Sequence, residues 1–304
     1  MWKKIFLPLA ILAISIPALK ACDACGCGIG SIYWGILPNN NLHTVGLSWQ
    51  NQHYTSHLGH DHEELLQSES AEYFNTLELR GRFYLNDRFS LSAIVPVGFH
   101  RRQSVGEWIN INGLGDISVM GNYRIFDSSD SLNHRVRHRF ELGLGVKIPT
   151  GSFNALDTES VVNPNFQLGS GSWDFLFSAN YTALMGQLGL QTNVTYKRNT
   201  TNSDDFRFGH RLNGSMMLFY RQNIKAFEFM PNLGLYGEWG GRDVENRYWQ
   251  NNTGGHLLMS NVGIELYVSR YNFGASYLHP IDQDWSAGQV EAQARYTAHI
   301  NVYF

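Results

Sequence analysis

The stretch that decides the fold is Gln289–Phe304, which reads QVEAQARYTAHINVYF. Its even-numbered positions, from Val290 to Phe304, carry apolar side chains, and its odd-numbered positions up to Asn301 carry polar ones. A period of two places successive side chains on opposite faces of a β-strand. This stretch therefore predicts one long strand with an apolar face and a polar face.

Two kinds of β-protein use such strands. A soluble sandwich buries the apolar face, whereas a membrane barrel turns it to lipid and turns the polar face into the lumen. Strand length favours the barrel, because soluble strands cluster near about five or six residues and a tilted membrane strand needs about 9–11. The closing Phe304 also resembles the terminal signal that the outer-membrane barrel-assembly machinery reads.

The same alternation recurs along the chain in twelve runs. They are residues 41–54, 71–85, 88–100, 113–126, 135–148, 171–185, 187–198, 206–221, 225–239, 255–269, 271–279 and 289–304. The gaps between them alternate between short (86–87, 127–134, 186, 222–224, 270) and longer (55–70, 101–112, 149–170, 199–205, 240–254, 280–288). Only 127–134 fits this order poorly. Outer-membrane barrels have short periplasmic turns, long outer loops and an even number of strands. We therefore expect an all-β fold, a single antiparallel transmembrane barrel of about twelve strands over residues 41–304, with both termini periplasmic.

The composition excludes several other classes of protein. The chain has 304 residues, a formal net charge of −3 and only 16% charged residues, which excludes a strongly basic nucleic-acid binder. The 13% of aromatic residues exclude a disordered chain. No run of about 18 apolar residues occurs, so a helical membrane protein is excluded as well.

The first 21 residues have the pattern of a secretory signal peptide. Lys3 and Lys4 precede the apolar stretch 5–19, and Ala21 supplies a small residue for cleavage. The mature chain would begin at Cys22, with a Cys- and Gly-rich periplasmic segment over residues 22–40. Lipidation of Cys22 is a second possibility. We expect residues 22–40 to fill part of the lumen, in a protein of the Gram-negative outer membrane.

Two groups of residues are candidate metal ligands. Cys22, Cys25 and Cys27 suit a soft ion such as Cu(I) or Zn, or alternatively one disulfide with one free or lipidated thiol. His53, His57, His60 and His62 suit a transition metal, or alternatively form a polar surface loop. The predicted topology separates the two groups by a barrel wall about 25 Å tall. The sequence identifies no certain cofactor, and copper or zinc is the candidate metal ion.

Charged residues on the polar faces are the candidates for lining the lumen. They are Glu78, Arg80, Arg82, Asp116, Arg124, Arg135, Arg137, Arg139, Glu141, Lys147, Arg211, Glu228, Glu291 and Arg295. Asp116 is expected to pair with Arg135, Arg137 or Arg139 on the next strand. Because buried charges need partners, this set indicates a structural charge ladder rather than a substrate site.

Catalytic residues are not predicted. His256 and Ser260 share a face, but four residues along a strand separate them by roughly 13 Å, too far for a hydrogen bond. Neither a nucleotide-binding motif nor a zinc-protease motif occurs. We therefore expect a non-enzymatic barrel that passes a small solute. The alternative is a metal-handling or structural binding barrel with a plugged lumen.

Three short Gly-rich motifs carry a family resemblance. They are Gly113-Leu114-Gly115-Asp116, Lys147-Ile148-Pro149-Thr150-Gly151 and Leu168-Gly169-Ser170-Gly171-Ser172-Trp173-Asp174. Over roughly residues 75–304 the chain resembles a family of outer-membrane transporters associated with the meta-pathway of phenol degradation. The resemblance implies an outer-membrane barrel for uptake or export of small compounds. The expected partners of the chain are outer-membrane lipid, the solute, and the barrel-assembly machinery, which the C-terminal strand contacts.

Overall fold

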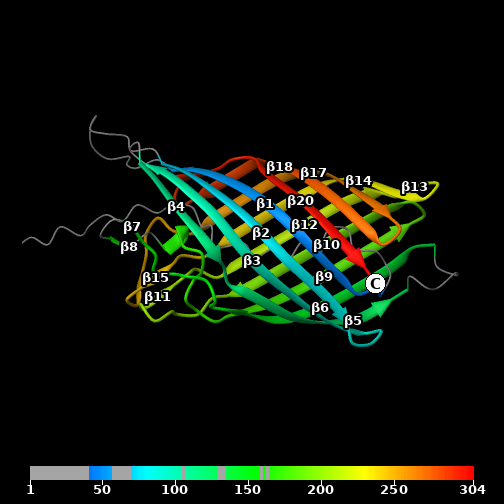
Figure 1. The fold of residues 1–304 in the computed structure, drawn as a ribbon, viewed down its shortest axis with the longest axis horizontal. Helices are drawn as coiled ribbons and strands as arrows, with labels where there is room; N and C mark the ends of the chain where they lie inside the picture. Colours follow the sequence, from blue (N-terminus) through cyan, green and yellow to red (C-terminus); the bar gives the residue numbers. More distant parts are fainter. Residues whose placement is uncertain (1–40, 57–69, 105–106, 129–134, 158–159, 162–163) are drawn as a thin grey trace, which may run out of the picture.

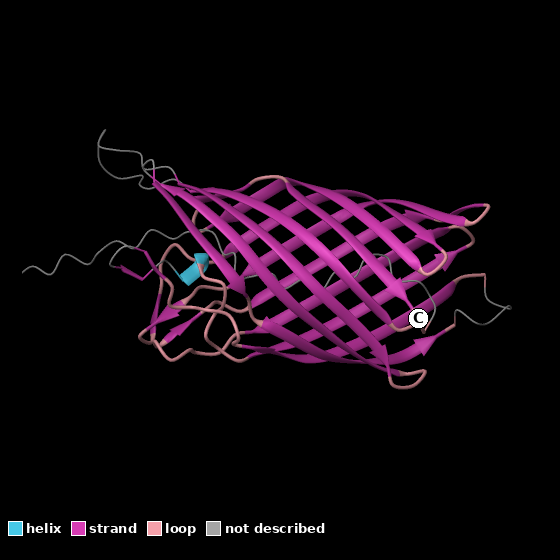
Figure 2. Cartoon of the chain, viewed as in Figure 1, coloured by secondary structure: helices cyan, strands magenta, loops and turns pink. Residues whose placement is uncertain are grey.

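The computed structural model describes residues 41–56, 70–104, 107–128, 135–157, 160–161 and 164–304. In this part of the chain, twelve antiparallel strands close into one barrel (Figures 1 and 2). The strands are β1 (Thr44–Ser56), β2 (Ser70–Tyr84), β3 (Phe89–Ser104), β4 (Glu107–Leu114) with β5 (Ile117–Asp127), β6 (Arg137–Ile148), β9 (Asp174–Met185), β10 (Leu188–Arg198), β12 (Arg211–Tyr220), β14 (Phe227–Gly240), β17 (Gly255–Val268), β18 (Tyr271–Trp285), and β19 (Val290–Ala292) with β20 (Arg295–Tyr303). Among the described residues, no helix has the length and hydropathy needed to cross a membrane.

Short elements join these strands. They are β7 (Leu156–Asp157), β8 (Ser160–Val161), the 3-10 turn η2 (Pro164–Phe166), β11 (Phe206–Arg207), β13 (Gln222–Ile224), β15 (Val244–Glu245) and β16 (Tyr248–Trp249). All except β13 lie at the end of the barrel that carries the long connections (Figure 1). The short turns and the C-terminus lie at the opposite end.

The first and last strands close the barrel. β1 pairs with β20 from Thr44 opposite Tyr303 to Asn51 opposite Tyr296. Every other barrel strand pairs with its neighbour in sequence. A closed barrel has no free edge strand on which another chain can pair. The predicted twelve-stranded antiparallel barrel is therefore confirmed.

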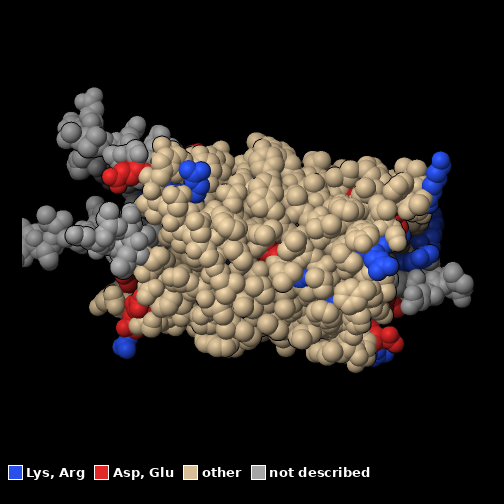
Figure 3. Space-filling model, viewed as in Figure 1, with Lys and Arg blue, Asp and Glu red and all other residues tan. Residues whose placement is uncertain are grey.

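The two faces of the wall have the polarity of a membrane barrel. Outward aliphatic side chains are exposed, as at Leu144 (65%), Leu233 (61%) and Val262 (62%), whereas inward polar side chains such as Glu78 (4%) and Arg82 (3%) are buried. The visible face of the wall is almost free of charge between its ends (Figure 3). This pattern is that of a membrane barrel, in which an apolar band faces the lipid and charges gather at its two edges.

Two predicted loops are mainly strand. Residues 101–112 form most of a long hairpin, because β3 runs on to Ser104 and β4 pairs with it from Glu107. Residues 280–285 extend β18, and β19 begins soon afterwards. In both places the strands continue with a mixture of polar and apolar side chains, such as Trp108 and Asn110 in β4 and Ile281 and Gln283 in β18. A search for apolar alternation therefore ended them too early.

The beginning of the last strand differs from the prediction. Val290 and Ala292 are buried in the barrel at 1% and 3% exposure, and Glu291 is exposed on the outer side. The strand breaks at Gln293 and Ala294, and from Arg295 onward the odd-numbered residues face inward. An interruption of this kind exchanges the two faces of a strand. The predicted apolar outer face is confirmed from Tyr296 to Phe304 and is wrong for Val290 and Ala292.

Candidate functional site

The strand pattern brings most of the predicted lumen residues together inside the barrel. Every second residue of each strand faces inward, so the polar residues of all the strands come together in the lumen. Nine of the predicted residues are buried there or at the inner rim: Glu78, Arg80, Arg82, Arg124, Arg139, Glu141, Lys147, Arg211 and Arg295. Asp116 joins them through Lys147.

Near the end with the short turns, these charges form a connected ladder. Arg82 Nη2 donates to Glu141 Oε2 at 2.7 Å, and Arg124 Nε lies 3.7 Å from Glu141 Oε1. Asp127 Oδ2 accepts from Arg139 Nε at 2.8 Å and lies 3.5 Å from Arg124 Nη1. Each buried charge therefore has an opposite charge beside it, as low-dielectric surroundings require.

A second cluster gathers the three Gly-rich motifs at one point. The Asp116 carboxylate accepts from the Gly151 N–H at 3.0 Å and the Ser170 N–H at 2.9 Å. Lys147 Nζ lies 2.6 Å from Asp116 Oδ2 and 2.8 Å from Asp174 Oδ2. We call Asp116, Lys147, Ser170 and Asp174 the anchor cluster. It ties the start of β5, the end of β6 and the start of β9 to the connection between β6 and β9.

That connection folds inward over the mouth of the barrel. Phe166 in η2 is fully buried, with its ring 5.7 Å from Phe74 and 6.3 Å from His100. The Leu168 side chain lies against Gly98, where a β-carbon would stand 2.6 Å from its Cδ2, so the absent side chain of Gly98 leaves room for it. The end of the barrel with the long connections thus contains a packed apolar cluster that includes Phe74, Phe166 and Trp285.

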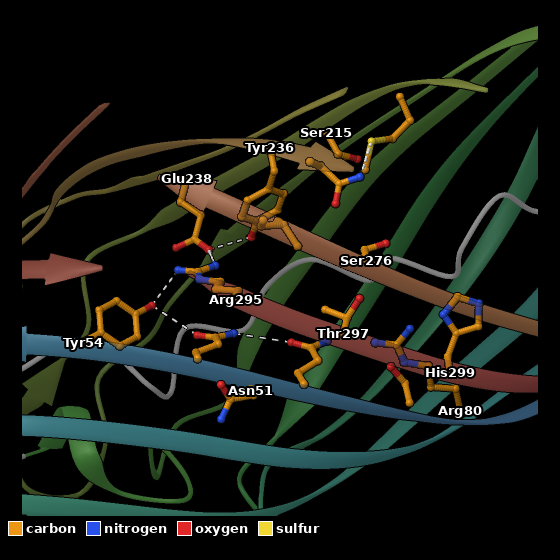
Figure 4. Close-up of a pocket in the computed structure, with 16 residues that line it drawn as sticks. Asn51, Tyr54, Arg80, Ser215, Tyr236, Glu238, Ser276, Arg295, Thr297 and His299 are labelled. Carbon is orange, nitrogen blue, oxygen red and sulfur yellow. Dashed lines mark hydrogen bonds and ion pairs between the residues drawn. The ribbon is translucent and has the colours of Figure 1, made fainter. Parts of the chain in front are cut away.

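Below this cluster lies an internal cavity of about 60 Å³ (Figure 4). Its lining comes from facing sides of the barrel: Ser48, Gln50, Asn51, Gln52, Tyr54, Arg80, Ser215, Met217, Tyr236, Glu238, Asn261, Ser276, Leu278, Arg295, Thr297 and His299. Hydroxyl and amide groups predominate, interrupted by a few apolar side chains. This mixture suits a small solute with several hydrogen-bonding groups.

Arg295 and Glu238 organise one wall of the cavity. The Arg295 guanidinium donates to Glu238 Oε1 and, at 2.7 Å, to the Tyr54 hydroxyl. The Tyr236 hydroxyl donates to the same Glu238 oxygen at 2.8 Å. These side chains converge from β1, β14 and β20 (Figure 4). Arg295 was predicted for the lumen, whereas Tyr54 was missed, because an aromatic residue near a strand end is easily assigned to the aromatic girdle at the membrane interface.

Four predicted lumen residues lie elsewhere. Arg135 precedes β6 and is exposed, and Arg137 is exposed at the first position of β6. Glu228 is half-buried near the short-turn end, where Arg221 Nε donates to it at 2.7 Å. Glu291 faces outward because the break at Gln293 and Ala294 exchanges the faces of the last strand.

The predicted partner of Asp116 is also wrong. Asp116 forms an ion pair with Lys147, near the C-terminal end of β6, and not with Arg135, Arg137 or Arg139. Asp116 lies at the start of β5 and pairs at the level where β6 ends, whereas the arginines lie at the beginning of β6. Antiparallel pairing places those ends a full strand length apart.

The candidate metal ligands are only partly within the described chain. Cys22, Cys25, Cys27, His57, His60 and His62 lie outside the described residues. His53 is described and faces outward from β1, with its ring stacked 4.3 Å from that of Tyr73. Among the described residues, no group of three or more His, Cys, Asp or Glu side chains is arranged to hold a metal.

The comparisons with known proteins agree on the fold. A family model described as "Putative MetA-pathway of phenol degradation" matches residues 70–288. An outer membrane channel from Pseudomonas putida F1 is similar at 15% identity and a TM-score of 0.63, over 89% of this chain and 100% of that chain. The β domain of the Bordetella autotransporter Brka is similar at 10% identity and a TM-score of 0.50, over 87% of this chain and 100% of that chain. No curated protein matches the chain.

Proposed function

The chain belongs to the MetA-pathway of phenol degradation family, and from this premise we propose that it is an outer-membrane channel for a small solute. The similar barrel from Pseudomonas putida F1 carries the name of an outer membrane channel, which supports the proposal. The family description does not identify the solute.

The observation that carries this proposal is the polar cavity inside the barrel. A purely structural barrel of this size can fill its interior with packed side chains, as small barrels do. Here a cavity of about 60 Å³ lies between Tyr54 and Arg80 on one side and Ser215 and Asn261 on another. Space lined by hydrogen-bonding groups suits a hydrated or polar solute on its way through.

Electrical recording tests the proposal directly. The full chain inserted into planar lipid bilayers is expected to give discrete, reproducible conductance steps. Heat-denatured protein in the same detergent serves as the control. If correctly folded protein inserts and gives no steps with ions and no flux of small solutes, the channel proposal fails.

The proposed targeting follows from the two ends of the chain. Residues 1–21 would direct export, residues 22–40 would enter part of the lumen from the periplasmic end, and residues 41–304 would span the outer membrane with the short turns on the periplasmic side. Phe304 would be read by the barrel-assembly machinery. Deleting Phe304 is then expected to lower the amount of folded protein in outer-membrane fractions severalfold, while Phe304→Tyr is expected to preserve it. Equal amounts for the deletion and the unchanged chain would contradict this role.

Copper or zinc handling is the alternative proposal, and the cysteine and histidine groups in the sequence support it. Titration of the purified chain with Cu(I) or Zn²⁺ tests it, with His57, His60 and His62 together changed to Ala as the variant. Unchanged affinity removes the histidine group from the proposal. Metal bound with no solute flux would favour this alternative over the channel.

A further inference from the structure

The two arginines that line the internal cavity are each paired with a carboxylate. Arg80 Nε donates to Glu78 Oε2 at 2.8 Å, and Arg295 donates to Glu238. His299 Nε2 lies 3.0 Å from Glu265 Oε2. Arg80, Glu238 and Arg295 are the Lys, Arg, Asp or Glu residues among the described side chains that line the cavity. A solute there meets hydrogen-bonding groups rather than an unbalanced charge.

The amides of β14 and β17 have unused hydrogen-bonding capacity beside this cavity. Asn261 lines it and is only 2% exposed, and its Oδ1 has no hydrogen-bond partner in the described part of the chain. Asn232 is 4% exposed, and its Nδ2 is likewise without a partner there. The remaining bonds are weak, since Asn261 Nδ2 reaches Met217 Sδ at 3.2 Å and Asn232 Oδ1 at 3.4 Å.

Buried polar atoms are nearly always hydrogen-bonded in folded proteins, so such atoms at a cavity mark a place where a ligand completes the network. The unpartnered atom that lines the cavity, Asn261 Oδ1, is an acceptor. A hydroxyl group of a solute can donate a hydrogen bond to it. Leu278 and Met217 add apolar surface on the same wall, suited to the carbon skeleton of a solute.

We infer that this cavity selects uncharged, hydroxyl-bearing solutes such as sugars and polyols. The inference rests on the proposed channel function and gives its solute class. A hydroxyl group of the solute donates to Asn261 Oδ1, which lines the cavity. An ion gains little here, because the ion pairs already satisfy the fixed charges and a transferred ion loses its hydration.

Measuring solute flux from proteoliposomes tests whether the channel selects uncharged, hydroxyl-bearing solutes. Vesicles holding the full chain are loaded with radiolabelled glucose, gluconate or glucosamine, three solutes of similar size with charges of zero, minus one and plus one. Glucose is expected to leave at least about tenfold faster than either charged solute, the ratio that about 1.4 kcal/mol of discrimination gives. Equal or faster flux of a charged solute overturns the inference and leaves the channel proposal standing. If none of the three leaves, the inference fails, and the channel proposal fails with it only where planar-bilayer recording also gives no conductance steps.

The amide wall is tested by a matched pair of substitutions. Asn261→Leu removes the acceptor and is expected to lower glucose flux about fivefold, the effect of one neutral hydrogen bond. Asn223→Leu makes the same change at an exposed position of β13 and is expected to leave flux unchanged. Folding of both is checked by the difference in electrophoretic mobility between unheated and heated samples. Folded Asn261→Leu protein with undiminished glucose flux overturns the role of the amide.

The charge balance is tested independently. Glu238→Gln leaves the Arg295 guanidinium without its carboxylate, so gluconate flux is expected to rise severalfold relative to glucose. Glu107→Gln removes a carboxylate from an exposed position of β4, away from the cavity lining, and is expected to leave the ratio unchanged. An unaltered gluconate-to-glucose ratio in folded Glu238→Gln protein contradicts the claim that paired charges make the cavity neutral.

Discussion

Lys147 places one positive charge between two buried carboxylates. Its ammonium group lies within 2.8 Å of both Asp116 and Asp174, and all three side chains are at most 8% exposed. The sequence motifs that hold these residues lie far apart in the chain, and only the strand pairing brings them together. The glycines of these motifs let the backbone segments approach each other at this point. For example, Gly169 N donates to Ser152 O at 2.8 Å.

Substituting Lys147 with Met is expected to destabilise the barrel by about 3–5 kcal/mol, because it leaves two buried carboxylates without their cation. The free energy of unfolding in urea, with the protein in lipid vesicles, measures this loss. Arg137→Met at the exposed end of β6 is the control, with an expected change within about 0.5 kcal/mol. A loss for Lys147→Met no larger than for the control would show that the anchor cluster adds no stability.

At the scale of elements, alternation in the sequence predicted the strands well and their side-chain partners poorly. Ten of the twelve runs overlap a single long strand of the barrel. The run 113–126 corresponds to β5 with the last residues of β4, and the run 289–304 corresponds to β19 with β20. Alternation indicates which face of a strand a residue occupies, so it predicted the inward positions of Glu78 and Arg82. It carries no information on register, so the partner of Asp116 was wrong. It also runs unchanged through the break at Gln293 and Ala294, so Glu291 was placed on the wrong face.

The outward face predicts a dependence on depth. Leu233 lies in the middle of β14 and is 61% exposed toward the apolar surroundings, so Leu233→Arg is expected to cost about 2–4 kcal/mol. Leu85, at the short-turn end, is 66% exposed, and Leu85→Arg is expected to cost about 0–1 kcal/mol. Unfolding in lipid vesicles compares the two. Equal costs would mean that Leu233 does not face the middle of the bilayer.

At the scale of the whole molecule, the barrel is asymmetric along its axis. One end is joined by tight turns, and the other is covered by the inward connection between β6 and β9 that carries Phe166. The cavity lies between the charge ladder and this apolar cover. In the proposed channel, the inward connection therefore limits passage at one end.

Deleting residues 153–168 is expected to raise single-channel conductance severalfold. The join is geometrically simple, because Gly169 N already donates to Ser152 O at 2.8 Å and the anchor cluster keeps all of its side chains. Planar-bilayer recording compares the deletion with the complete chain. Phe166→Leu, which keeps an apolar side chain at the same site, is the control and is expected to change conductance little. A deletion variant that folds and conducts no better would place the limit to passage elsewhere.

The pairing of β1 with β20 also has a consequence for the order of folding. Contacts between neighbouring strands close short loops, whereas this seam joins residues from opposite ends of the described chain. Loop-closure entropy and the delay of long-range contacts both make such pairing slow. We therefore expect this seam to be the last pairing to form. Until it forms, the two outermost strands would expose their backbone hydrogen-bonding groups on an open sheet that has not yet closed at Thr44 and Tyr303.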